Sequence, residues 1–187
     1  MQHYLDIRIL PDPEFNTNLL MNALFNKLHR ALVMLQSDRI GVSFPRAGAS
    51  SPGLGALLRL HGSEEALCQL MALNWLQGMR DHITPTDIRL IPQRCQYRCI
   101  SRLQVKSSAE RLRRRQMKRH GLSEQQARVL IPDSIEQRTK LPFLAVKSSS
   151  SGQSFKLFIR LEALQDKPTD GSFNCYGLSR DASVPWF

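Results

Sequence analysis

Apolar and polar side chains follow regular periods along the first half of the chain, and they predict four strands and two helices. Residues 4–10 alternate between apolar and polar side chains, which is typical of a strand with one buried face. Between residues 16 and 36, apolar side chains recur every three or four positions, which predicts a helix that begins near Asn16 or Thr17. The other predicted elements are strands at 40–44, 57–61 and 88–91 and a helix at 63–78.

The order of these elements, β-α-β-β-α-β, is that of the ferredoxin-like, RRM-like fold. We assign it to an N-terminal domain of residues 1–94. Proteins of many unrelated functions share this order, so it does not by itself predict an activity.

The second half, residues 95–187, predicts a smaller mixed α/β domain, so the chain as a whole is of the α+β class. Its most distinctive element is a helix at 108–120 that carries a basic face and ends at Gly121. The other predicted elements are a helix at 123–130 and strands at 99–105, 143–146, 155–161 and 174–178. No long linker separates the halves, so we expect them to pack against each other.

The charge of the chain favours a polyanionic partner, because the formal net charge is +10 and the sequence pI is about 10.0. Residues 1–94 contain 9 Lys and Arg against 8 Asp and Glu, whereas residues 95–187 contain 17 against 8. The net charges are therefore +1 and +9, and the basic character belongs to the second half. A soluble protein with a basic surface and no such partner is the alternative.

The basic residues concentrate in residues 111–119, where six of nine side chains are cationic. At helical spacing, five of them fall on one face, namely Arg111, Arg114, Arg115, Lys118 and Arg119. Like charges at these spacings repel, and the chain has no matching acidic run, so a nucleic-acid backbone is the favoured source of counter-charge. A solvated face or a helix that contacts an acidic protein are the alternatives. The face does not distinguish RNA from DNA.

Several classes of protein do not fit the sequence. No apolar run is long enough to span a bilayer, and the first residues lack the segments of a signal peptide, so we expect a cytoplasmic protein. No glycine-rich phosphate loop, clustered acidic motif or zinc spacing occurs, although Cys95 and Cys99 resemble half of a metal site. We therefore expect no metal or other cofactor. We expect reduced thiols at Cys68, Cys95, Cys99 and Cys175.

Short motifs spread over the whole chain match one family, and together they are specific. They are residues 3–8 (HYLDIR), 11–15 (PDPEF), 38–45 (DRIGVSFP), 110–115 (ERLRRR), 152–155 (GQSF), 157–160 (LFIR), 175–179 (CYGLS) and 184–187 (VPWF). By these motifs the chain resembles the CRISPR-associated endoribonucleases of the type I-F (Ypest) system, which cut repeat RNA into guide RNAs.

The resemblance implies a catalytic trio. His29 matches the family's general base, Tyr176 the tyrosine that orients it, and Ser148 the serine that holds the ribose at the cleavage site, with Ser150 as the competitor for that role. The implied reaction uses no metal: the 2′-hydroxyl attacks the neighbouring phosphate, and an imidazole, which titrates near neutral pH, accepts the hydroxyl proton. The expected products are a 2′,3′-cyclic phosphate and a 5′-hydroxyl.

The resemblance also implies how the RNA is held. Arg102 and Gln104 match residues that recognise the closing part of a repeat RNA stem, and Phe155 matches an aromatic that stacks under the terminal base pair. The implied phosphate contacts are Arg114, Arg115, Lys118, Arg119 and His120, with Arg111 and Ser150 as further RNA-binding candidates. Lys118 stands where the family pattern suggests arginine, which keeps the charge but loses the bidentate fork. The implied partners are the repeat RNA stem-loop, as precursor and as product, and other subunits of a type I-F surveillance complex.

Without the resemblance, each catalytic candidate has an ordinary structural interpretation. His29 lies beside the apolar stripe of its helix, Ser148 lies in a run of four serines typical of a turn, and Tyr176 suits a core. Phe155 equally suits a core. Two other functions therefore stay open: a non-catalytic hairpin-RNA-binding subunit of a ribonucleoprotein, and a basic protein-interaction subunit such as a ribosomal component.

Overall fold

The computed structural model describes residues 1–48, 53–105, 109–135, 139–147 and 152–187. The chain forms two compact units. The larger unit comprises Met1–Arg102 together with Pro142–Phe187, and the helical unit comprises Leu103–Leu141. This division differs from the predicted one at residue 94, because the strands that follow the helical unit return to the core of the first half. The fold is mixed α/β with antiparallel sheets.

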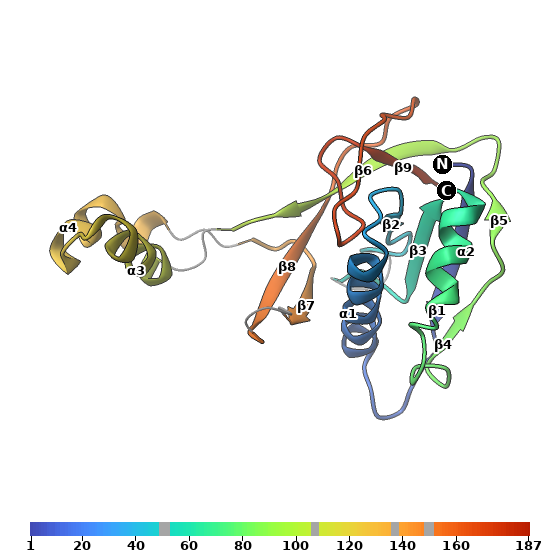
Figure 1. Ribbon diagram of the computed structural model, residues 1–187, viewed down its shortest axis with the longest axis horizontal. Coiled ribbons are helices and arrows are strands. Elements are labelled where there is room, and N and C mark those ends of the chain that lie inside the picture. The colour runs from blue at the N-terminus through green and yellow to red at the C-terminus, as the bar shows by residue number, and fades with distance from the viewer. Residues whose placement is uncertain (49–52, 106–108, 136–138, 148–151) are drawn as a thin grey trace. The chain divides into compact units, whose positions relative to one another are not determined.

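The first sheet of the larger unit has five strands among the described residues: β1 (His3–Ile9), β2 (Gly41–Ser43), β3 (Leu57–Gly62), β4 (Ile83–Pro85) and β5 (Arg89–Leu90). Four of them lie side by side in the order β2-β3-β1-β4, and β5 also pairs with β1. The pairs that β1 makes with β3, β4 and β5 are all antiparallel (Figure 1). The predicted strand at 88–91 is reduced to β5, and the pattern did not predict β4, whose pairing to β1 is set by the tertiary fold.

Helices α1 (Thr17–Leu35) and α2 (Glu64–Ala72) both contact this sheet. The predicted start of α1 is confirmed, because Asn16 is its N-cap and accepts a hydrogen bond from the backbone N–H of Leu19 at 2.9 Å. The apolar stripe of α1 is buried: Met21, Leu24, Phe25, Leu28 and Leu32. Helix α2 ends well before the predicted position, because Asn74 takes a left-handed conformation (φ 49°) and turns the chain.

The second sheet is formed by β6 (Gln96–Leu103), β7 (Phe143–Lys147), β8 (Ser154–Leu161) and β9 (Ser183–Trp186), in the order β7-β8-β6-β9. Its buried side chains, among them Leu144, Leu157 and Val184, belong to the same hydrophobic core as α1 and the first sheet. One core that draws on both halves of the sequence explains why the larger unit does not end near residue 94. The strand predicted at 174–178 is instead a turn.

The helical unit contains α3 (Ala109–His120), α4 (Glu124–Leu130) and a short 3-10 helix, η1 (Asp133–Ile135). Helix α4 begins with a capping box, in which the hydroxyl of Ser123 accepts from the backbone of Gln126 and the side chain of Gln126 accepts from the backbone of Ser123. This unit has few buried apolar side chains among the residues described: Ala109, Ala127 and Ile131.

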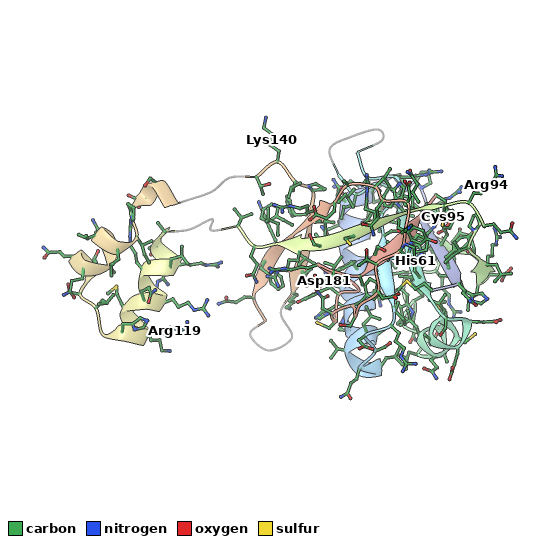
Figure 2. All side chains as sticks on the ribbon, turned by 90° about the horizontal axis from the view of Figure 1, so that it is seen from above. His61, Arg94, Cys95, Arg119, Lys140 and Asp181 are labelled. Carbon is green, nitrogen blue, oxygen red and sulfur yellow. The ribbon has the colours of Figure 1, made fainter. Side chains whose placement is uncertain are left out.

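A buried polar pair joins β2 to β3 within the first sheet. The hydroxyl of Ser43 and Nε2 of His61 lie 2.8 Å apart, and both residues are fully buried. Figure 2 shows His61 surrounded by the crowded side chains of the larger unit. Burial, reinforced by the nearby charge of Arg59, lowers the pKa of His61 to about 3, so the imidazole is neutral in the folded protein.

This histidine predicts a loss of stability in acid. The unfolded chain takes up a proton at His61 below about pH 6.5, whereas the folded chain resists it down to about pH 3, so the free energy of unfolding falls by about 1.4 kcal/mol per pH unit in between. Replacing His61 by Gln keeps a polar partner for Ser43 and removes the titration. Urea unfolding at pH 7 and pH 4.5 should show that the wild type loses about 2–3 kcal/mol more than His61→Gln. Equal losses in the two proteins would contradict the assignment.

Candidate functional site

The side chain of His29, on α1, is largely buried within the larger unit and is only 7% exposed. Its Nδ1 lies 2.8 Å from the backbone carbonyl oxygen of Cys175. A carbonyl can only accept a hydrogen bond, so the imidazole N–H is at Nδ1 and donates to this oxygen. The neutral ring therefore has its lone pair at Nε2, which is the form that a general base needs.

The ring of Tyr176 stacks on that of His29. Their centroids are 4.1 Å apart and the planes differ by 15°. The ring of Tyr176 is also parallel to that of Phe25, which lies one helical turn before His29 on α1. These two ring centroids are 6.4 Å apart, and the ring planes differ by 2°. The contact between Tyr176 and the imidazole is thus between ring faces, and Nδ1 of His29 donates its hydrogen bond to a backbone carbonyl rather than to the tyrosine hydroxyl. Burial, and secondarily the Cys175 thiol, raise the pKa of Tyr176 against the opposing charge of Arg102, so its hydroxyl is protonated at neutral pH.

A tight turn holds Cys175 and Tyr176 in place. The side-chain oxygen of Asn174 accepts hydrogen bonds from the backbone N–H of Tyr176 (2.8 Å) and Leu178 (3.3 Å). Gly177 has a left-handed φ of 69°, and its carbonyl accepts from the backbone of Val42 in β2 at 2.9 Å. A Cβ at Gly177 would lie 2.6 Å from Cγ1 of Val42, so only glycine fits this contact. The turn is therefore anchored to the first sheet.

Arg102 on β6 and Phe155 on β8 lie in the same region of the larger unit. The guanidinium carbon of Arg102 is 5.3 Å from the ring centroid of Phe155, and its charge acts on Tyr176. Nε of Arg102 is buried and has no hydrogen-bond partner among the residues that the structure describes. The guanidinium therefore places a positive charge near the ring of Phe155 and close enough to Tyr176 to act on it electrostatically, and a cation of this kind is suited to an anionic ligand.

The structure thus brings together four of the residues selected from the sequence: His29, Tyr176, Arg102 and Phe155. Ser148 and Ser150 lie outside the described residues. Gln104 is exposed and belongs to the helical unit, with the basic residues of α3.

The basic residues of α3 form an exposed face on the helical unit. The exposed members are Arg111, Arg114, Arg115, Lys118, Arg119 and His120. Figure 2 labels Arg119 near the end of this helix. The whole helical unit has ten Lys and Arg against four Asp and Glu, a net charge of +6 of the chain's +10. The density of positive charge is that of a nucleic-acid interface.

Arg113 has a different task from its neighbours. Its Nε donates to the backbone carbonyl of Ile131 at 2.7 Å and its other nitrogen pairs with Asp133 at 2.7 Å, so it ties α3 to the end of α4 and to η1. Among the exposed cations, Arg114 pairs with Glu110 at 2.8 Å, but both side chains are more than 70% exposed, so a phosphate can replace this partner at little cost.

Two functional contributions were not predicted from the sequence. The hydrogen-bond partner of His29 is the backbone carbonyl of Cys175. Every residue has such a carbonyl, so the residue type gives no sign of this role. Arg113 is distinguished from the other arginines only by its phase on the helix, which places it off the predicted basic face.

No three His, Cys, Asp or Glu side chains gather closely enough to hold a metal ion in the part of the chain that the structure describes. The four cysteines are unpaired. None of the described helices is both long and apolar enough to cross a membrane.

Comparison with known proteins gives a consistent result. Residues 4–187 match the sequence profile of a family described as CRISPR-associated protein (Cas_Csy4). The chain is 51% identical to a CRISPR-associated endonuclease Cas6/Csy4 of Pseudomonas aeruginosa (strain UCBPP-PA14), over 187 residues that make up all of both chains. It is 49% identical to a protein of the same name from Escherichia coli (strain UTI89 / UPEC), again over the full length of both.

Proposed function

Because the chain belongs to the Csy4 family of CRISPR-associated endonucleases, we propose that it is a metal-independent endoribonuclease that cuts a CRISPR repeat RNA hairpin at its base. The observation that carries the proposal is the hydrogen bond from Nδ1 of His29 to the carbonyl of Cys175, since it leaves Nε2 free to accept a proton in a largely buried site. Tyr176 limits the rotation of the imidazole by stacking on it.

The proposed reaction is an internal transesterification. Nε2 of His29 takes the proton of the ribose 2′-hydroxyl, the 2′-oxygen forms a bond to phosphorus, and the bond from phosphorus to the 5′-oxygen breaks. The leaving 5′-oxygen takes a proton from water and the imidazolium of His29 returns its proton to solvent, so the products are a 2′,3′-cyclic phosphate and a 5′-hydroxyl. We assign Ser148 to hold the ribose so that its hydroxyl is in line with the phosphate, with Ser150 as the alternative.

RNA binding divides between the two units in this proposal. Arg102 and Gln104 recognise the closing part of the stem, and Phe155 stacks under the last base pair. The position of the Arg102 guanidinium over the ring of Phe155, and its electrostatic effect on Tyr176, support the roles of Arg102 and Phe155. The exposed cations of α3 contact the phosphates of the stem: Arg111, Arg114, Arg115, Lys118, Arg119 and His120.

We further propose that the larger unit contains a ferredoxin-like arrangement, which the strand order β2-β3-β1-β4 with α1 and α2 on the sheet supports. The protein would act in the cytoplasm, stay bound to the mature guide RNA, and join the other subunits of a type I-F surveillance complex.

The proposal is tested by incubating the protein with a labelled repeat hairpin in excess chelator. Cleavage should proceed at the same rate with and without chelator, because the nucleophile and the base come from the RNA and from His29. The 5′ fragment should end in a 2′,3′-cyclic phosphate, and a hairpin with a 2′-deoxyribose at the cleavage site should bind but stay intact. Complete loss of cutting in chelator, or a 3′-hydroxyl end on the 5′ fragment, would overturn the proposed chemistry.

A further inference from the structure

Strand β7 lies at the edge of the second sheet, with β8 on one side only. In an antiparallel pair, alternate residues turn their backbone N–H and C=O groups toward the same side. The backbone groups of Ala145 and of Lys147 are therefore candidates for the open side of β7, where a further strand would normally bind.

Two asparagines of α1 occupy that open side. The side-chain oxygen of Asn22 accepts from the backbone N–H of Ala145 at 2.9 Å. The side-chain nitrogen of Asn26 donates to the carbonyl of Ala145 at 2.8 Å, and its oxygen accepts from the N–H of Lys147 at 2.9 Å. The amide of Asn26 thus presents a donor and an acceptor to β7 as the backbone of a neighbouring strand would.

Hydrogen bonds to both the nitrogen and the oxygen of the Asn26 side-chain amide fix its orientation. Its nitrogen also donates to the backbone carbonyl of Asn22 at 2.7 Å, so a flipped amide would bring its oxygen against two carbonyl oxygens. Asn22, Asn26 and His29 follow each other at spacings of four and three residues, which places them along one side of α1.

The strand that these asparagines hold is directly connected to the proposed site. Val146 of β7 pairs with Phe155 of β8, and Lys147 pairs with Ser154. The side chains of Leu144 and Val146 are fully buried in the shared core, so β7 is held from its inner face as well. The asparagine contacts add a hydrogen-bonded link from α1, which carries His29, to the β7–β8 pair, which carries Phe155.

We propose that Asn22 and Asn26 are positioning residues for RNA cleavage, in that they fix α1, and with it His29, against the β7–β8 strand pair. This inference rests on the proposed function, since it assigns the contact a role in that reaction. Asn26 is the principal residue, because it holds two of the three backbone groups. The competing interpretation is that the asparagines only cover a sheet edge, which would affect folding and association but not the chemical step.

Asn26→Ala separates these interpretations, because it removes two contacts to β7 at a helical site that accepts alanine well. We expect the single-turnover cleavage rate to fall about 10- to 100-fold, as for a displacement of the order of 1 Å between reacting groups. The dissociation constant of the RNA hairpin should stay within about twofold, and the pH dependence of the rate should keep its shape. Asn22→Ala, which removes one contact, should have a smaller effect in the same direction.

The matched control is Asn16→Ala, which removes the N-cap of the same helix and leaves β7 untouched. It should lower the melting temperature without changing the cleavage rate. Hydrogen exchange gives a second measurement that needs no RNA. The amide of Lys147 should exchange about three to ten times faster in Asn26→Ala than in the wild type, and the amide of Ala145 should do so in Asn22→Ala.

The outcomes are distinguishable. A wild-type rate in Asn26→Ala, unchanged exchange of the Lys147 amide in that variant, or an equal loss of rate in Asn16→Ala would each overturn the positioning role. A wild-type protein that cuts no hairpin would remove the proposed function and the catalytic part of this inference, while faster exchange in Asn26→Ala would then assign the asparagines to edge protection alone.

Discussion

His29→Ala is expected to abolish hairpin cutting and to leave hairpin binding nearly unchanged. In the proposed reaction the imidazole accepts the 2′-hydroxyl proton, and general-base catalysis of this kind contributes about 10²- to 10⁴-fold to a rate. Binding is retained because the contacts proposed for the RNA come from Arg102, Phe155 and the basic face of α3. Single-turnover cleavage of a labelled hairpin and a filter-binding isotherm, measured on the same preparation, give the two quantities.

A histidine elsewhere in the larger unit supplies the control. Nδ1 of His82 lies 2.7 Å from a carboxylate oxygen of Asp12, so His82→Ala also removes a half-buried imidazole and a polar contact. Its cleavage rate should match that of the wild type. If His29→Ala cut at the wild-type rate, or lost RNA binding together with cutting while still folded, the assignment of the base would be wrong.

Removing the charge of the α3 face is expected to give the largest loss of affinity. The variant combines Arg114→Ala, Arg115→Ala, Lys118→Ala and Arg119→Ala, all at exposed positions. If each cation meets one phosphate, the slope of log affinity against log salt should become less steep by about 1 per residue, and affinity at low salt should fall by at least about 100-fold. Binding measured at four or more salt concentrations gives both the slope and the affinity.

Arg128→Ala is the control for this loss. Arg128 is an exposed cation of the same helical unit, but it lies on α4 and pairs with Glu124 at 2.8 Å. Its substitution should leave the salt slope unchanged. Equal affinity of the wild type for the hairpin and for an unpaired RNA of the same length would instead favour a basic protein-interaction subunit, and an unchanged slope in the fourfold variant would exclude the α3 face as the phosphate-binding surface.

Local sequence patterns predicted those elements that are determined by residues close together in the sequence. The stripe and cap of α1, the capping serine of α4 and the basic face of α3 each depend on residues within one or two helical turns, and all three are found in the structure. The resemblance to a known family added the choice of His29 and Tyr176, which the structure places in contact. Without the resemblance, His29 would have been interpreted as a structural or exposed residue and Tyr176 as a core or strand aromatic.

The features that were not predicted depend on contacts between distant residues. The extent of the larger unit follows from side chains such as Leu157 and Val184 that join the core of the first half, and a pattern read within a short window does not contain that information. Residues 174–178 were predicted as a last strand, but Asn174 and Gly177 close them into a turn. The oxygen that fixes the tautomer of His29 is a backbone atom of Cys175, so its position could not be predicted from the amino-acid sequence.

His29 and the carbonyl that orients it are separated by 146 residues of sequence. During translation, α1 with His29 therefore leaves the ribosome long before the turn that contains Cys175 and Tyr176 has been made. Until the last part of the polypeptide has emerged and folded back, a nascent chain carries the histidine without the Cys175 carbonyl and without the Tyr176 ring. The arrangement around His29 is therefore completed only after translation of this region and long-range folding have both finished.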